Sequence, residues 1–214
     1  MKAALRTMIT LLTPRSRTFL WPALALLALF FAFAATGCQR YDVLVEKDQI
    51  AAQKWADLEA QLQRRYDLVP NLVATVKAAA KHEEDTLAKV TEARAEVTKV
   101  KLTADDLTDP EKVAAFQKAQ AQLQSSLSRL MVIQEQYPDL KANQNFHGLQ
   151  VQLEGTENRI LRAREEYNAA ARDYNAELLK IGGQVVNKVT GLPFKPRVYF
   201  SATVESQAAP KVSF

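Results

Sequence analysis

Apolar side chains recur every three or four positions along most of the chain after residue 50, which is the spacing of an amphipathic helix. Pro70 interrupts the first stripe, and proline inside a helix removes a hydrogen bond and clashes with the preceding turn. We therefore predict a kink or a restart between Leu68 and Asn71, with a second helix running to about Lys101. The first stripe comprises Trp55, Leu58, Leu62, Tyr66, Val69, Leu72, Val76 and Ala80, and the second continues with Val73, Val76, Leu87, Val90 and Val97.

Two further helices are predicted after a loop at 102–110. Residues 108–111 read Thr-Asp-Pro-Glu, which offers a side-chain cap, a proline for the first turn and an early acid. Pro138 should end this third helix. Its stripe is Val113, Phe116, Gln120, Leu123, Leu127, Leu130, Gln134 and Tyr137; the fourth helix carries Phe146, Leu149, Leu153, Thr156, Ile160, Ala163, Tyr167, Ala171, Tyr174, Leu178 and Ile181. The fold class is thus all-α, a long antiparallel bundle of about four helices with coiled-coil-like packing.

The end of the chain has a different character. Gly182 and Gly183 should stop the last helix. Beyond them come Pro193, Pro196 and Pro210 and a β-prone run at 198–200. We expect the bundle at 43–183 and an extended C-terminal tail at 184–214.

The amino terminus is typical of export. A basic stretch precedes residues 19–37, which carry no charge, and Cys38 follows Ala35, Thr36 and Gly37. This junction resembles a bacterial lipobox, which implies a signal peptide at 1–37, lipidation of Cys38 and a short linker at 38–42. The alternative is an uncleaved spanning helix at 19–37, which is just long enough to cross about 30 Å of hydrocarbon. Both place a membrane anchor before the bundle.

Charge removes one class of function. The net charge of +4 comes entirely from residues 1–37, which hold four basic and no acidic side chains, so the remainder is neutral. A neutral domain with both signs of charge interspersed lacks the basic patch that binds a phosphate backbone, so nucleic acid is not an expected partner. Because Cys38 is the only cysteine, the exported domain must be stable without an intramolecular disulfide.

Several long motifs resemble the bacterial LemA family. The most specific is Gln-Arg-Arg-Tyr-Asp-Leu-Val-Pro-Asn-Leu-Val at 63–73. The likeness continues at Lys77, 82–83, 93–94, 135–142, 153–160, 163–164, 167–168, 174–175 and 209–212. The resemblance implies a membrane-anchored helical bundle outside the cytoplasm without an established catalytic activity, and some relatives are linked to membrane remodelling such as magnetosome formation. The chain departs from the family at 181–183, where Ile-Gly-Gly replaces the Phe-Pro common there.

Candidate chemistry is sparse. A di-iron bundle needs Glu-x-x-His on two helices, but Ala79 precedes His82 and Gln144 precedes His147 at that spacing. No nucleophilic triad or phosphate loop is recognisable. We therefore expect no metal, no cofactor and no enzymatic activity.

One polar constellation remains as a candidate interaction site. It consists of Arg64, Arg65, Asp67, Pro70 and Asn71 on the first helix, with Glu154, Glu157, Asn158, Arg159 and Arg164 on the last. These side chains could form a charged layer that reads a partner. Alternatively, they set the register between helices, with Asp67 and Asn71 satisfying backbone groups freed at Pro70. Tyr137, Tyr167 and Tyr174 are expected in the core with hydroxyls at the bundle edge.

Two functions fit these features. The first is an envelope scaffold or adaptor that assembles with itself or with a membrane-associated protein. The second is a binding module that captures a peptide or lipid between helices near Pro70. Gln39 after the cysteine is not the Asp that resembles an inner-membrane retention signal, so in a two-membrane bacterium we expect the outer membrane, with the bundle facing the periplasm.

Overall fold

Every regular element of the chain's described part is helical, which confirms the all-α prediction. The computed structural model describes the backbone of residues 17–80, 83–191 and 194–201, and side chains from residue 40 onward within those ranges except residues 189 and 190. The elements are α1 Arg17–Ala79, α2 Glu84–Lys99, the short 3-10 helix η1 Asp105–Thr108, α3 Pro110–Ile133, α4 Pro138–Lys141, α5 Gln144–Leu179 and α6 Ile181–Thr190.

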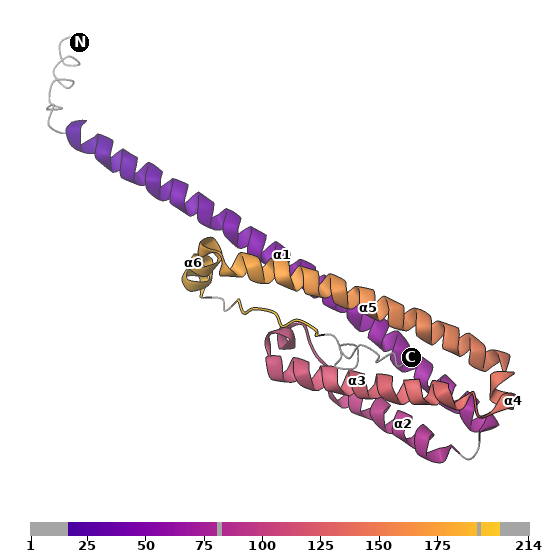
Figure 1. Ribbon diagram of the computed structural model, residues 1–214. Helices are drawn as coiled ribbons and strands as arrows, with labels where there is room; N and C mark the ends of the chain where they lie inside the picture. Colours follow the sequence, from indigo (N-terminus) through magenta and orange to yellow (C-terminus); the bar gives the residue numbers. More distant parts are fainter. Residues whose placement is uncertain (1–16, 81–82, 192–193, 202–214) are drawn as a thin grey trace, which may run out of the picture.

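The helices form an elongated bundle. In Figure 1, α5 lies along α1, while α2 and α3 form a hairpin against the C-terminal half of α1. The short α4 turns the chain at the far end of the bundle, and α1 emerges from the opposite end. The bundle is therefore a rod with α1 as its axis.

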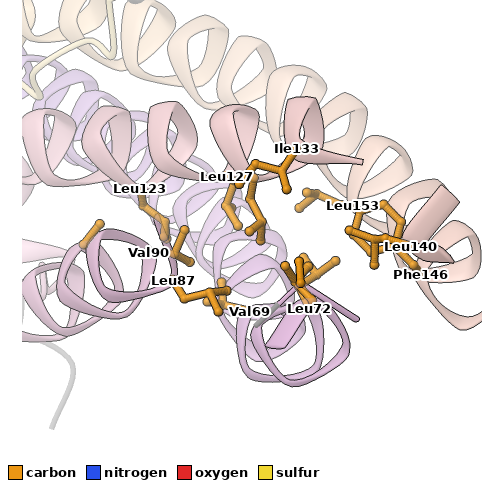
Figure 2. Close-up of a cluster of buried hydrophobic side chains, with 14 residues drawn as sticks. Val69, Leu72, Leu87, Val90, Leu123, Leu127, Ile133, Leu140, Phe146 and Leu153 are labelled. Carbon is orange, nitrogen blue, oxygen red and sulfur yellow. The ribbon is translucent and has the colours of Figure 1, made fainter. Parts of the chain in front are cut away.

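The core lies where the apolar stripes predict it. One cluster lies toward the α4 end of the rod (Figure 2). It joins Leu72 of α1, Val90 of α2, Leu127 of α3 and Phe146 of α5. A second cluster surrounds Trp55 in the middle of the rod. A third joins Leu44, Tyr174, Leu178 and Val186 beside α6. Aliphatic and aromatic burial of this kind is the main source of the bundle's stability.

Pro70 does not end a helix, so the predicted restart between Leu68 and Asn71 is wrong. Helix α1 continues through Pro70 to Ala79, and α2 begins at Glu84. Proline lacks the N–H that would bond the carbonyl oxygen of Tyr66. Arg94 of α2 compensates, because its Nε donates to that oxygen at 3.5 Å and its guanidinium lies 4.0 Å from the centre of the Tyr66 ring. A tertiary contact thus replaces the lost helical bond.

This compensation gives a testable result. Pro70→Ala should raise the free energy of unfolding by about 1–3 kcal/mol. Proline is about 3 kcal/mol less favourable than alanine inside a helix, and the rigidity it gives the unfolded chain offsets up to about 1 kcal/mol. Urea titration followed by far-UV circular dichroism measures the change. Arg94→Met should cost more in the wild-type chain than in the P70A background, and equal costs in both would refute the compensation.

The start of α3 forms as predicted, although the predicted loop at 102–110 contains the 3-10 helix η1. The side chain of Asp109 accepts hydrogen bonds from the backbone N–H groups of Glu111 and Lys112, and Pro110 occupies the first turn. Helix α3 ends at Ile133, one turn earlier than Pro138, and Pro138 instead begins α4. Asn143 caps α5 in the same way as Asp109 caps α3.

The glycine pair does not end the helical structure, which corrects the predicted tail boundary at residue 184. Helix α5 ends at Leu179, but α6 begins at Ile181 and contains both glycines. A Cβ on Gly183 would lie 2.4 Å from the carbonyl oxygen of Glu177, so only glycine lets α6 fold back across the end of α5. Gly191, whose φ of 64° is left-handed, caps the end of α6, and residues 194–201 run extended along the bundle (Figure 1).

Within the part of the chain that the structure describes, no helix is long and apolar enough to cross a membrane. The side chains of 19–37 and of Cys38, which carry the predicted anchor, lie outside the described residues. The anchor stays a prediction.

Candidate functional site

A buried arginine joins three helices in the middle of the bundle. Arg65 of α1 is only 2% exposed. Its Nη1 donates to both carboxylate oxygens of Glu157 on α5 at 3.2 Å, and its Nη2 donates to the side-chain oxygen of Gln120 on α3. Its Nε is buried without a hydrogen-bond partner. This layer therefore connects α1, α3 and α5 at one level of the bundle.

Arg164 lies beside this layer, two turns along α5 from Glu157. Burial, and then the neighbouring charge of Arg65, lower the pKa of the Arg164 guanidinium, while Glu157 opposes the shift. The Glu157 carboxylate, which pairs with Arg65, therefore also acts electrostatically on Arg164. The cavity between them has a volume of about 30 Å³ and is also lined by Gln120 and Phe200, which is room for one or two water molecules.

The structure brings together only part of the predicted constellation. Arg65, Glu157 and Arg164 meet, whereas the other seven residues are on the surface: Arg64, Asp67, Pro70, Asn71, Glu154, Asn158 and Arg159. The Asp67 carboxylate accepts from Gln63 within its own helix. The expectation that Asp67 and Asn71 satisfy the backbone at Pro70 is wrong, since Arg94 does so.

A second polar arrangement holds the extended segment 194–201 against α5. The side chain of Asn175 pairs with both backbone groups of Arg197, accepting from its N–H and donating to its carbonyl, each at 2.8 Å. Asn168 pairs with Phe200 in the same manner at 2.9 and 2.8 Å. Each asparagine thus acts as a neighbouring β-strand would, satisfying backbone groups that secondary structure leaves free.

Two tyrosines complete this clamp. The hydroxyl of Tyr174 donates to the Lys195 carbonyl and that of Tyr167 to the Val198 carbonyl, both at 3.1 Å. Burial raises the pKa of both tyrosines to about 12. The prediction of core tyrosines with hydroxyls at the bundle edge is confirmed for these two. Tyr137 is half-buried and donates to the Glu83 carboxylate.

Side chains of the extended segment also enter the core. The ring of Phe200 stacks on Trp55 with centroids 5.6 Å apart and packs edge-on against Phe116 and Tyr167. Arg197 is buried and donates to the Asp48 carboxylate of α1 at 2.9 and 3.0 Å. We did not predict this contact. The signal available in the sequence is the repeated Tyr-Asn pair at 167–168 and 174–175, whose seven-residue spacing puts both pairs on one helical face.

A cavity of about 180 Å³ opens between α1, α2 and α3. Its floor contains Trp55, Leu62, Leu102 and Phe116, and its rim contains Tyr66, one turn before Pro70. Polar and charged side chains, among them Glu59, Gln63 and Lys101, make up about half of the lining, so the cavity suits a small amphipathic ligand.

No group of three His, Cys, Asp or Glu side chains in the described residues lies close enough to hold a metal ion. His147 is exposed near the start of α5, and His82 lies outside the described residues.

Comparison with known proteins shows which family this chain is related to. The LemA family model matches residues 54–214. The chain belongs to the LemA family. Three relatives are 29% identical over 185 residues, which cover 79% of this chain and 67% of each relative: magnetosome proteins MamQ 1 and MamQ 2 of Paramagnetospirillum magneticum and magnetosome protein MamQ of Magnetospirillum gryphiswaldense.

The LemA match includes both polar arrangements. Its first segment contains Arg65 and Pro70, and its later part contains Glu157 and the Tyr-Asn pairs that clamp the extended segment. In this LemA-family chain, several residues of these motifs therefore lie at contacts between helices or between α5 and segment 194–201.

Proposed function

We propose that this LemA-family chain is a non-enzymatic, membrane-anchored envelope protein that acts as a scaffold or adaptor in a membrane-associated assembly. The observation that carries the proposal is the shape of the bundle. The bundle is a rod with segment 194–201 packed along it. Helix α1 emerges from one end of this rod, and its N-terminal part leads to the predicted anchor. The magnetosome proteins that it resembles are named for a membrane-bounded organelle, which agrees with assembly at a membrane.

The anchor that this function needs is tested by the mass of the mature amino terminus. Acylated Cys38 without residues 1–37 would support the lipoprotein, and an intact leader with free Cys38 would favour the spanning helix. Fractionation of a two-membrane host should recover the protein with the outer membrane if it is a lipoprotein.

Site-specific crosslinking tests the scaffold itself. The exposed aliphatic residues Val132 and Val151 lie on α3 and α5 at the end of the rod remote from α6. A photoreactive residue at either position should yield one crosslinked species of reproducible mass in intact cells, either a homo-oligomer or a complex with one protein. The matched control is Lys118 on the exposed side of α3. A solitary monomer at every position would contradict the proposal.

A second function, capture of a peptide or lipid between the helices, is favoured by the 180 Å³ cavity beside Tyr66. Native mass spectrometry of the purified full chain should then show a bound molecule. Val97→Phe, which adds volume to the cavity wall, should remove it without lowering the melting temperature. If no molecule is bound to the wild-type chain from its own host, the capture function fails.

A further inference from the structure

Helix α6 presents aliphatic side chains to solvent on the side away from the bundle. Its inner face carries Gly183 and Val186, which are buried. Its outer face carries Ile181, 82% exposed, and Val185, 44% exposed, and Leu179 at the end of α5 adds a third aliphatic group that is 70% exposed. Adjacent large aliphatic groups in solvent mark a contact surface.

The sequence from α6 onward is basic, although Lys180 is paired with Glu177. Between Glu177 and Glu205 the sequence contains Lys180, Lys188, Lys195 and Arg197 and no acidic residue. Arg197 is buried against Asp48, while the three lysines are exposed. Lysines flanking exposed aliphatic groups are typical of helices that lie in the interface of an anionic membrane.

The position of α6 relative to the predicted anchor matches such an interface. Gly182 lies against the side chain of Arg40, since a Cβ there would be 3.3 Å from the arginine Cγ. Arg40 follows Cys38 by two residues, or about 3 Å along α1. The headgroup layer of one leaflet is about 5–8 Å thick. A chain anchored at Cys38, or spanning through Gly37, therefore holds α6 at the depth of the headgroups.

Helix α6 is also fixed in orientation. Gly183 packs directly on the backbone of Glu177 and Leu178. The Glu177 carboxylate accepts from Lys180 at 2.6 Å and from Arg40 at 3.4 Å, and the hydrogen bond from Lys180, with Arg40 nearby, lowers the pKa of Glu177. The same face therefore always points away from the bundle.

We propose that α6, together with Leu179, is an interfacial helix that docks on the anionic surface of the bilayer holding the anchor. The aliphatic groups enter the headgroup layer, and Lys188 and Lys195 contact anionic lipid. This second contact sets the angle of the rod to the membrane, which a single flexible tether would leave free. The inference rests on the proposed membrane anchor and adds a separate lipid contact to it.

Quenching by brominated lipids tests the contact. The full chain is reconstituted into phosphatidylethanolamine and phosphatidylglycerol vesicles with bromine near the headgroup, in a Trp21→Phe background in which buried Trp55 gives a constant signal. Ile181→Trp should add fluorescence that the bromolipid quenches strongly. Val151→Trp, a matched control at an aliphatic position 55% exposed on α5 and about 40 Å away along the helix, should add fluorescence that is not quenched.

A variant that removes one positive charge tests whether the exposed face of α6 contacts anionic lipid. Lys188→Gln should lower the ratio of docked to undocked α6 about fivefold in these vesicles, because each basic side chain near an anionic surface contributes about that factor. It should have no effect in neutral phosphatidylcholine vesicles.

Vesicle flotation distinguishes the two proposals. If the protein floats but Ile181→Trp is quenched no more than Val151→Trp, the docking is refuted and the anchor stands. If the protein does not float, both fail. If the indole introduced by Ile181→Trp leaves water only when the chain is in a complex with a protein or a second copy, the face is a protein contact. The lipid proposal is then overturned.

Discussion

Phe200→Ala is expected to lower the free energy of unfolding by about 3–5 kcal/mol, the range for removing a buried phenylalanine. The ring is only 6% exposed and contacts Trp55, Phe116 and Tyr167, so its loss opens a cavity between α1, α3 and α5. Urea titration of the full chain in detergent, followed by far-UV circular dichroism, measures the change. The emission of Trp55 should shift to longer wavelength as water reaches the cavity.

Two variants of the same segment control this result. Lys195→Ala removes an exposed side chain from the tail and should change stability by less than about 0.5 kcal/mol. Asn175→Ala leaves the buried backbone groups of Arg197 without partners and should cost about 2 kcal/mol or more. If Phe200→Ala costs no more than Lys195→Ala, the segment 194–201 is not part of the folded bundle in solution.

Glu157→Ala is expected to cost about 3 kcal/mol, because removing this partly exposed carboxylate leaves the buried charge of its partner uncompensated. Here the remaining charge is Arg65, with the second guanidinium of Arg164 beside it. Arg65→Met should cost less, since it removes the buried charge and retains most of the volume. The double variant should resemble Arg65→Met alone, and the same titration measures all three.

Glu154→Ala is the matched control, one turn earlier on α5 and exposed. It should be nearly neutral. A different outcome would change the role of the layer: if Glu157→Ala keeps full stability but loses the crosslinked species expected from Val132 or Val151, the charged layer reads a partner instead of fixing the register.

The periodic stripes predicted the helices well because apolar spacing is a local property of the sequence. Leu72, Leu127 and Ile160 are buried as expected. The predicted helix boundary at Pro70 was wrong for a physical reason. Proline weakens a helix locally, but Arg94, 28 residues away from Tyr66 in the sequence, supplies the missing hydrogen-bond donor. The boundary at Gly182 failed similarly, since the glycines serve close packing on Glu177 as well as chain freedom.

The site was predictable only where its members share one helix face. Glu157 and Arg164 are seven residues apart, so their proximity follows from helical geometry. The contact of Arg65 with Gln120 depends on how three helices align, which no local pattern specifies. The pairing of Asp48 with Arg197 joins residues 149 apart in the sequence, and Arg197 lies in a segment that we predicted only as extended.

The clamp on the extended segment has a consequence for biogenesis. The middle of the core needs Trp55 from the first helix and Phe200 from near the end of the chain. Contacts between such distant residues are slow to form. Until residue 200 has been synthesised, the aromatic cluster is incomplete and the chain stays short of its full stability. For the export that we propose, this delay is an advantage, since a chain that completes its fold before crossing the membrane cannot pass.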